Sequence, residues 1–306
     1  MPHQTTDHLV LIRPRAFAVG SPTHLDNKFM TAAPPERQAE IAAAARAEFE
    51  HYVDTLRRAG LRLTILDDRA DVHTPDSVFP NNWFTTHADG TFVTYLLAYD
   101  SRRLERRPDL LELLVRDHRI DRVLAFEDWE REQRYLEGTG VLVLDRVRKI
   151  AYVCLSARAT RSAIHDWCAA LGYRPLTFRA VGASGLPIYH TNVMLSIGTK
   201  AAIVCLDAVL DPAEKSKLTE SLALTGKRIV GISQAQLDDF AGNALEVRTP
   251  AGPAWVMSSR AYESLDPAQL EALGAPVIHA PLPTLETYGG GSARCMIAEV
   301  FLPLRS

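Results

Sequence analysis

The chain has 306 residues, of which 47% are hydrophobic and 23% charged, so it is long and apolar enough for one large globular domain or two ordinary ones. A formal net charge of −3 gives no overall attraction to nucleic acid or to an anionic membrane, and neither is an expected partner. No apolar run approaches the roughly 20 residues that span a bilayer, and the first residues lack the basic and apolar regions of a secretory signal, so we expect a cytoplasmic protein.

The predicted elements begin with a strand at residues 8–14, a long helix at 35–58 and a second strand at 61–68. The rest of the chain repeats one order of elements: two β-rich strands joined by a turn, a helix with apolar spacing, and a further strand. Full units of this kind occupy residues 81–127, 138–178, 191–232 and 243–280. A fifth unit starts at residue 295 and supplies only one strand, and the N-terminal elements provide the helix and the strand that it lacks.

Equivalent positions at the mouths of the five units lie at an almost constant spacing, with intervals of 55, 53, 53 and 52 residues. Such a period predicts an α/β fold, a five-bladed pseudo-symmetric propeller of ββαβ units that forms one domain over residues 1–306. Pairing of the N- and C-terminal segments would close the ring and leave fewer exposed sheet edges. Equivalent positions in a closed ring face its axis, so five side chains are expected to line one central cavity: Asn82, Glu137, His190, Asn243 and Cys295.

This set of side chains has the parts for an addition–elimination reaction at a trigonal carbon. Cys295 is the candidate nucleophile, because an imidazole or another donor nearby favours the reactive thiolate. His190 is the candidate acid and base, and Glu137 is the carboxylate that orients or binds. The glycine run at 289–291 lets backbone approach a ligand closely. Taken singly, each side chain also fits an ordinary role, as an inert thiol, a structural donor or an exposed residue before a turn, and only their convergence favours chemistry.

The sequence has no pattern typical of a metal site or an organic cofactor. No two cysteines have the C-x-x-C spacing, the histidines lack metal-ligand spacing, and neither a G-x-G-x-x-G nor a P-loop motif is present. We therefore expect no metal and no cofactor. The other cysteines stand in apolar or helical stretches and are expected to be buried free thiols: Cys154, Cys168 and Cys205.

Short motifs along nearly the whole chain resemble those of the guanidino-group-modifying enzymes of the pentein fold, which include arginine deiminases, dimethylarginine dimethylaminohydrolases and hydrolases of citrulline or arginine. "PDSVFPNNW" resembles "PDxVFVED", "LEGTGVL" resembles "LDGGDVL", "LSARAT" resembles "LSKRTN", and "AGNALEV" resembles "AANCVYL". "YHTNV" resembles "LHLKS", and "GGGSARCMIAEV" resembles the glycine-rich segment with the nucleophilic cysteine. The order and spacing of these motifs carry the resemblance, and the overall pattern is most similar to the citrulline-utilisation hydrolase branch.

The resemblance implies a role for each matched residue. Cys295 would be the nucleophile, His190 the general acid and base, and Glu137 the acid that holds the reacting nitrogen group of the substrate. Arg102 and Arg158 would clamp the substrate α-carboxylate, a task that suits the planar guanidinium fork. The other implied contacts are Asp76 with the α-amino group, Asn27 as a second pocket asparagine, and Asn243 as a cavity-lining residue with no chemical role.

Some of these assignments have alternatives. Arg103 takes the place of Arg102 if the register shifts by one residue. Arg102 and Arg158 each also fit an ordinary role as a surface charge at the start of a helix. Residues 25–38, with their proline-rich connection to the long helix, are expected to cover the cavity.

The identity of residue 82, an asparagine, indicates which substrate the site favours. The aligned residue in the deiminases and dimethylarginine hydrolases is a carboxylate that pairs with a cationic guanidinium, whereas an amide can donate to a neutral ureido oxygen. The sequence therefore favours a hydrolase that converts citrulline, or arginine, to ornithine with release of ammonia. Alternatives are an arginine deiminase, a dimethylarginine hydrolase, an amidinotransferase, a non-enzymatic binding module of the same fold, and a simple turn-capping role for Asn82. The expected partner is a small amino acid, and a homo-oligomer is left open.

Overall fold

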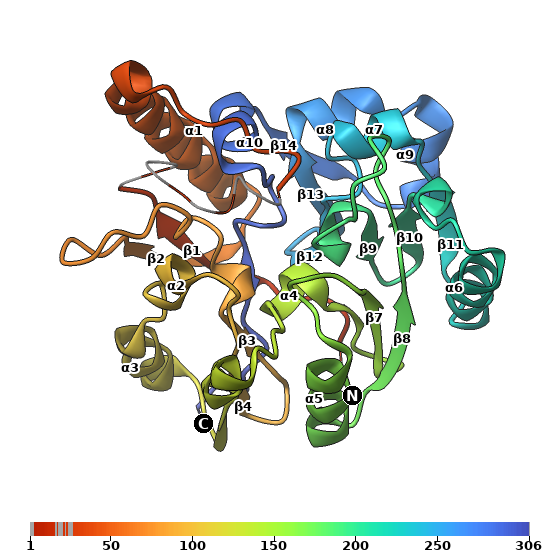
Figure 1. Ribbon diagram of the computed structural model, residues 1–306, viewed down its shortest axis with the longest axis horizontal. Helices are drawn as coiled ribbons and strands as arrows, with labels where there is room; N and C mark the ends of the chain where they lie inside the picture. The colour runs from red at the N-terminus through yellow and green to blue at the C-terminus, as the bar shows by residue number, and fades with distance from the viewer. Residues whose placement is uncertain (1–2, 16, 18–20, 22, 24–26, 306) are drawn as a thin grey trace.

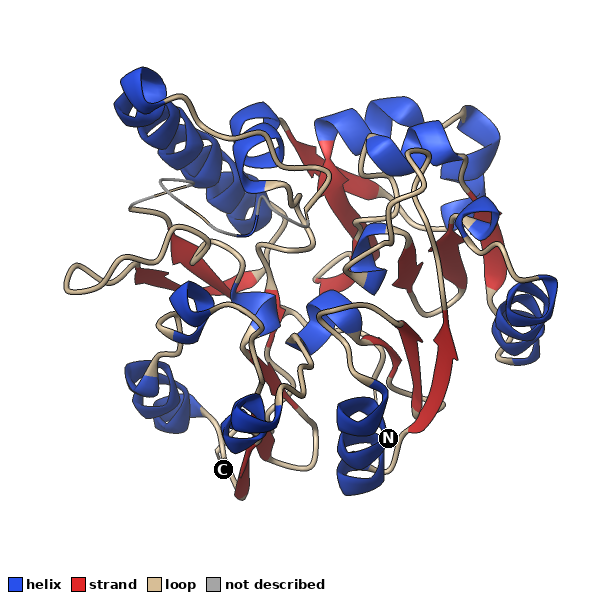
Figure 2. Ribbon diagram, in the orientation of Figure 1, coloured by secondary structure: helices blue, strands red, loops and turns tan. Residues whose placement is uncertain are grey.

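The computed structural model describes residues 3–15, 17, 21, 23 and 27–305 (Figure 1). Within these residues the strands form five three-stranded sheets. The sheets are arranged around a common centre, and the longer helices lie towards the outside of the molecule (Figure 2). The α/β propeller class that the repeat predicts is therefore confirmed.

Each sheet has one unit's strands, and the strand bounds follow the predicted segments closely. The first sheet contains β15 (Ala298–Glu299), β1 (His8–Arg13) and β2 (Arg62–Asp67), and the second contains β3 (Phe84–Thr86), β4 (Thr91–Thr94) and β5 (Arg122–Ala125). The third contains β6 (Val143–Asp145), β7 (Ile150–Cys154) and β8 (Arg174–Phe178), the fourth β9 (Leu195–Ile197), β10 (Ala201–Val204) and β11 (Arg228–Gly231), and the fifth β12 (Leu245–Thr249), β13 (Gly252–Ser258) and β14 (Val277–Ala280).

The helices lie mainly in the connections between the second and third strands of each unit. The α-helices are α1 (Gln38–Arg58), α2 (Asp100–Arg103), α3 (Pro108–Asp117), α4 (Gly138–Val141), α5 (Arg161–Leu171), α6 (Pro212–Leu224), α7 (Gln234–Asp238), α8 (Ser259–Ser264), α9 (Pro267–Leu273) and α10 (Pro283–Gly289). The 3-10 turns are η2 (Pro35–Arg37), η3 (Pro80–Asn82), η4 (Glu127–Glu132), η5 (Thr191–Val193) and η6 (Leu206–Ala208).

The unit that contains β6, β7 and β8 shows the build that the units share. β6 and β7 form an antiparallel pair, with Leu144 opposite Ala151. β8 then pairs in parallel with β7, which requires a crossover, and α5 provides it. α5 ends at Leu171 and is capped by Gly172, whose φ of 69° is the left-handed conformation that glycine adopts without strain.

The two ends of the chain complete the first sheet. β1 pairs antiparallel with β15, with Leu9 opposite Glu299 and Val10 opposite Ala298. On its other side β1 pairs in parallel with β2 over six positions, and α1 forms the crossover between them. The predicted pairing of the N- and C-terminal segments is thus present.

The outer helix α1 covers the sheets with one apolar face. Its buried residues recur at three- and four-residue intervals, as an amphipathic helix requires: Ile41, Ala45, Phe49, Tyr52, Val53 and Leu56. This face packs against β14 and α10, and α10 leads directly into the glycine run before Cys295. The hydrophobic core that contains α1 therefore supports the segment that carries the thiol.

The mouths of the units lie in short turns rather than at the strand starts that the sequence predicts. Asn82 closes η3, Glu137 precedes α4, and His190 precedes η5. Each turn brings the chain inwards before it enters the first strand of its unit, and Pro80 favours such a turn because its φ is fixed. None of the helices in the described residues is both long and apolar enough to cross a bilayer.

Candidate active site

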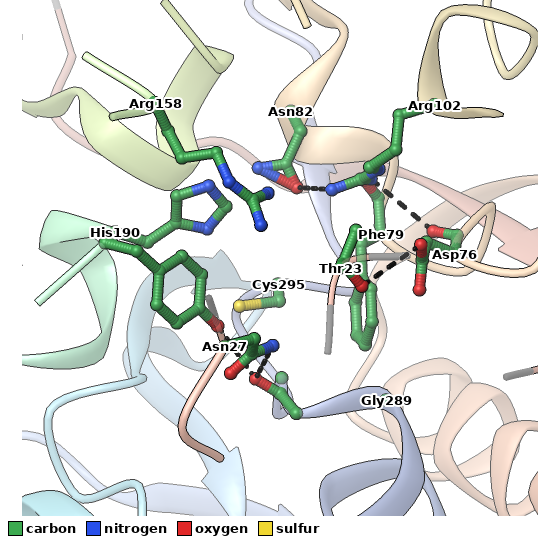
Figure 3. Close-up of a pocket in the computed structure, with 13 residues that line it drawn as sticks. Thr23, Asn27, Asp76, Phe79, Asn82, Arg102, Arg158, His190, Gly289 and Cys295 are labelled. Carbon is green, nitrogen blue, oxygen red and sulfur yellow. Dashed lines mark hydrogen bonds between the residues drawn. The ribbon is translucent and has the colours of Figure 1, made fainter. Parts of the chain in front are cut away.

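A pocket of about 310 Å³ lies between residues from several of the units, and Figure 3 shows the side chains that line it. Most of the predicted site residues line it, although they come from distant parts of the sequence: Asn27, Asp76, Asn82, Arg102, Arg158, His190 and Cys295. Two predicted residues, Glu137 and Asn243, do not line the pocket and instead lie behind its wall, as their contacts show below. The sequence-based reasoning did not identify Thr23, Phe79 and Tyr189, which also line the pocket.

Cys295 is held at the end of a tight loop and is 4% exposed. Its backbone N–H donates to the Ser292 carbonyl at 3.0 Å, and the Asn243 amide nitrogen donates to its sulfur at 3.1 Å. Burial raises the pKa of the Cys295 thiol, and the hydrogen bond from Asn243 acts against this rise. The thiol therefore needs its hydrogen-bond donors if it is to ionise at neutral pH.

One side of the His190 ring faces the pocket, and the other side forms a hydrogen bond with a carboxylate. Its Nε2 lies 2.7 Å from Oε2 of Glu137. Burial lowers the pKa of His190, and Glu137 opposes this shift. An ionised Glu137 keeps a proton on Nε2, so Nδ1 is the ring nitrogen that can accept a proton from a ligand.

Glu137 is completely buried, and its carboxylate is already occupied. Besides His190, it accepts hydrogen bonds from Nη1 of Arg158 at 3.1 Å and from the backbone N–H of Ala98 at 3.0 Å. Burial by itself raises the pKa of Glu137, but Arg158 and His190 bring it well below its usual range, and the carboxylate is ionised. The carboxylate thus contacts three protein donors, and its implied contact with the substrate nitrogen stays a prediction.

Arg102 also has a partner that the resemblance did not suggest. Its Nε and Nη2 donate to the two oxygens of Glu105, each at 2.9 Å, and its Nη1 donates to Oδ1 of Asn82 at 3.3 Å. Glu105 thus pairs with one edge of the guanidinium, and the implied contact of Arg102 with a substrate carboxylate stays a prediction. The register itself is as expected, because Arg103 does not line the pocket and donates to the carbonyl of Leu97.

Asn82 is 2% exposed, and its amide has a fixed direction. Oδ1 accepts from Arg102, and Nδ2 has no hydrogen-bond partner among the described residues. Figure 3 shows this nitrogen on the side of His190. Gly140 allows this arrangement, because a Cβ there would clash with Asn82 Nδ2 and lie 2.9 Å from His190 Nδ1. The amide bonds to Arg102 and does not have the turn-capping role that was the alternative.

Opposite charges stand at two sides of the pocket. Asp76 accepts a hydrogen bond from the Ser21 hydroxyl at 2.6 Å and lies beside Thr23. Arg158 is buried, with its guanidinium carbon 4.7 Å from the centre of the Tyr99 ring. A zwitterionic amino acid has both an ammonium and a carboxylate, and these two side chains offer a partner to each.

Asn27 reaches the glycine run from the N-terminal part of the chain. Its Nδ2 donates to the carbonyl of Gly290 at 3.1 Å, and the hydroxyl of Tyr189 donates to the same carbonyl at 2.9 Å. The segment expected to cover the cavity is 25–38, of which residues 25 and 26 lie outside the described residues. Asn27 is the part of it that lines the pocket.

The other cysteines are all buried free thiols, as predicted: Cys154, Cys168 and Cys205. Among the residues that the structure describes, no cluster of three or more histidine, cysteine or acidic side chains is arranged to hold a metal ion.

Comparison with known proteins connects this geometry to a family. The family model described as "N,N dimethylarginine dimethylhydrolase, eukaryotic" matches residues 13–302. No curated protein matches the sequence significantly.

Several solved structures share the fold. The N-terminal domain of ArgZ bound to substrate, an arginine dihydrolase from the ornithine–ammonia cycle in cyanobacteria, has a TM-score of 0.73 and 15% identity over 96% of this chain and 99% of its own. AgrE with ornithine and NAD+ has a TM-score of 0.73 and 18% identity over 98% of this chain and 40% of its own. A dimethylarginine dimethylaminohydrolase adduct with S-methyl-L-thiocitrulline has a TM-score of 0.68 and 15% identity over 97% of this chain and 99% of its own. Identities this low show the fold alone.

Proposed function

The chain belongs to the N,N dimethylarginine dimethylhydrolase family, and on that premise we propose that it is a cysteine-dependent hydrolase of guanidino or ureido C–N bonds that forms ornithine from citrulline or arginine. The reaction releases ammonia and needs no metal or organic cofactor. Its partner is a small amino acid rather than a macromolecule. Support for this reading comes from the pocket, which brings a thiol, an imidazole and opposite charges to one place.

The observation that carries the choice of substrate is the direction of the Asn82 amide. Its oxygen is taken by Arg102, so its NH2 group is what remains for a ligand. A buried donor without a partner is costly, and a ligand that supplies an acceptor removes that cost. The ureido oxygen of citrulline is such an acceptor, whereas a guanidinium carries only N–H donors.

The amino-acid end is held at the charged side chains of the pocket. Asp76 accepts from the α-ammonium group, and Arg158 donates to the α-carboxylate. Arg102 does not share this clamp, because Glu105 fills its fork, and it acts on the substrate through Asn82. Glu137 likewise acts through the groups it holds, His190 and Arg158.

The chemical steps proceed through a bond between the substrate carbon and sulfur. The Cys295 thiolate attacks the central carbon of the ureido group, the bond from that carbon to the leaving nitrogen breaks, and His190 supplies the proton that this nitrogen gains. A water molecule that gives its proton to His190 then attacks the same carbon and restores the thiolate. Departure of the ornithine nitrogen leaves a carbamoyl group on the sulfur, and hydrolysis of that group gives carbamic acid, whose C–N bond breaks to release ammonia and carbon dioxide. Citrulline and one water thus become ornithine, ammonia and carbon dioxide. Arginine first loses ammonia with a second water and leaves citrulline in the site.

Product analysis tests the proposal against its rivals. The protein is incubated separately with arginine, citrulline and dimethylarginine, and ornithine, citrulline and ammonia are measured. Ornithine from arginine or citrulline supports the proposal. If citrulline accumulates as the final product from arginine, the protein is a deiminase. If citrulline forms only from dimethylarginine, it is a dimethylarginine hydrolase. Turnover that requires an added amine acceptor indicates an amidinotransferase, and a lack of turnover under all conditions indicates a binding module.

Asn82→Asp tests the amide directly. The new carboxylate can accept but not donate, so citrulline loses its donor while the guanidinium of arginine gains an anionic partner. We expect kcat/KM for citrulline to fall about 10- to 100-fold, the size of a hydrogen bond to a polar or charged group, and the ratio of arginine to citrulline to rise. Steady-state kinetics with both substrates on the same preparation measure that ratio and cancel any loss of folded protein. An unchanged ratio would refute the role of the amide.

A further inference from the structure

Two amide side chains contact the sulfur of Cys295 from outside the ligand pocket. Nδ2 of Asn243 lies 3.1 Å from the sulfur, and Nδ2 and Oδ1 of Asn192 lie 3.7 and 3.8 Å from it. Both residues are fully buried, and neither lines the pocket that holds the other site residues. Asn192 follows the His190 mouth position by two residues, ahead of β9, and Asn243 is the mouth position ahead of β12.

The direction of the Asn243 amide is fixed by backbone groups. Its Oδ1 accepts from the backbone N–H groups of Arg294 and Cys295, at 3.1 and 3.4 Å. Its Nδ2 donates to the carbonyl of Asn192 at 3.0 Å as well as to the sulfur. A flipped amide would place its NH2 group against two N–H donors, so the group that faces the sulfur is a donor.

A hydrogen-bond donor at sulfur favours the thiolate over the thiol. Among the described residues, the titratable and charged groups around Cys295 do not provide another such donor. Arg294 donates to Glu299 and to the Ile297 carbonyl. Tyr52, on α1, donates to the Ala293 carbonyl, and burial raises its pKa well above the usual value, so it stays neutral. His190 is bonded to Glu137.

We propose that Asn243, assisted by Asn192, stabilises the Cys295 thiolate from behind the pocket and so prepares the nucleophile before a substrate binds. The proposal rests on the proposed function, in which Cys295 is the nucleophile. It gives Asn243 a chemical role in place of the cavity-lining role that the sequence suggested. It also explains why the amide, and not a carboxylate of the same shape, stands at this mouth of the ring, because a carboxylate would repel the thiolate.

Alkylation without substrate tests the proposal. The rate at which iodoacetamide modifies Cys295 is followed from acid to alkaline pH, and peptide mass spectrometry separates this thiol from Cys154, Cys168 and Cys205. We expect Asn243→Ala to move the pH midpoint of the rate upwards by about one unit or more, because one hydrogen bond to a charged group is lost. Asn192→Ala should move it upwards by less, because its contacts to sulfur are longer.

Asn243→Asp provides the sharper variant. Asp keeps the acceptor for the N–H groups of Arg294 and Cys295, so the loop retains its hydrogen bonds, but it brings a negative charge in place of the donor. We expect an upward shift larger than that of Asn243→Ala. Thermal unfolding of each variant reports whether the fold is kept, and Asn243→Asp carries the test if Asn243→Ala does not fold. Alkylation profiles of folded variants that coincide with the wild type would overturn the proposal. Because no substrate is used, that result is distinct from a failure of the proposed function, which the product analysis reports.

Discussion

Replacement of Cys295 by serine is expected to lower kcat for citrulline and arginine by about 10⁴-fold or more, the scale at which loss of a catalytic nucleophile acts in other hydrolases. A serine hydroxyl is far less acidic than a thiol, and the amides of Asn243 and Asn192 cannot ionise it at neutral pH. The pocket itself changes little, because sulfur and oxygen occupy the same place. Steady-state ornithine formation gives kcat, and calorimetric titration of citrulline shows whether Cys295→Ser still binds.

Cys168→Ser is the matched control. Cys168 is a buried free thiol on α5, away from the residues that line the pocket, and burial raises its pKa to about 12. Its substitution tests the effect of a buried hydroxyl on the fold without touching the reaction, so kcat should stay within a few-fold of the wild type. A Cys295→Ser variant that keeps more than a tenth of the wild-type kcat would contradict the assignment of the nucleophile.

Replacement of Glu137 by glutamine is expected to lower kcat by roughly 10³- to 10⁴-fold, as occurs when the carboxylate behind a catalytic histidine is made neutral. The amide of glutamine can no longer accept from His190, Arg158 and Ala98 together, and its NH2 group favours the wrong tautomer of the imidazole. It also removes the negative charge that pairs with the buried guanidinium of Arg158.

The pH profile of Glu137→Gln separates this positioning role from a loss of folded protein. In the wild type, Glu137 opposes the lowering of the His190 pKa by burial. Without that carboxylate the pKa of His190 falls further, so the acid limb of the rate profile should move to lower pH. A destabilised fold would reduce the amount of active protein and leave the limb in place.

Glu246→Gln is the control for this pair. Glu246 is also a buried carboxylate, and its oxygen accepts from the backbone N–H of Thr199 at 2.6 Å, away from the residues that line the pocket. Its substitution introduces the same buried amide without touching His190. It should cost stability while the pH profile of the remaining activity stays unchanged. A Glu137→Gln variant with the wild-type kcat and acid limb would mean that the carboxylate does not position the imidazole.

Much of the fold could be predicted from the sequence because its determinants are local and repeated. Each unit carries its own turns, its own β-rich strands and a helix with an apolar face such as that of α1, and the period near 53 residues shows how the units follow one another. Closure of the ring could also be predicted, because the last unit has only β15, and β1, which pairs with it, and β2 complete its sheet.

The partners of the site residues could not be predicted in the same way, since they depend on how turns from different units pack. Glu105 takes the fork of Arg102 because the chain turns just after α2 and brings this carboxylate, three residues further on, to the same buried spot. Glu137 lies behind His190 because α4 and η5 pack together, which no single motif encodes. The "HTN" sequence offered a signal for Asn192, two residues after His190, but the contact of this amide with sulfur depends on the position of the Cys295 loop.

The most direct measurement follows the carbon of the substrate itself. Arginine that carries a heavy isotope at its guanidino carbon is mixed with the enzyme, the reaction is quenched in acid within the first turnover, and the peptides are analysed by mass spectrometry. We predict that the labelled carbon is found on the Cys295 peptide of the wild type and is absent from the same peptide of Cys295→Ala. Label on a different residue, or release of labelled product by Cys295→Ala at the wild-type rate, would contradict covalent catalysis at this thiol.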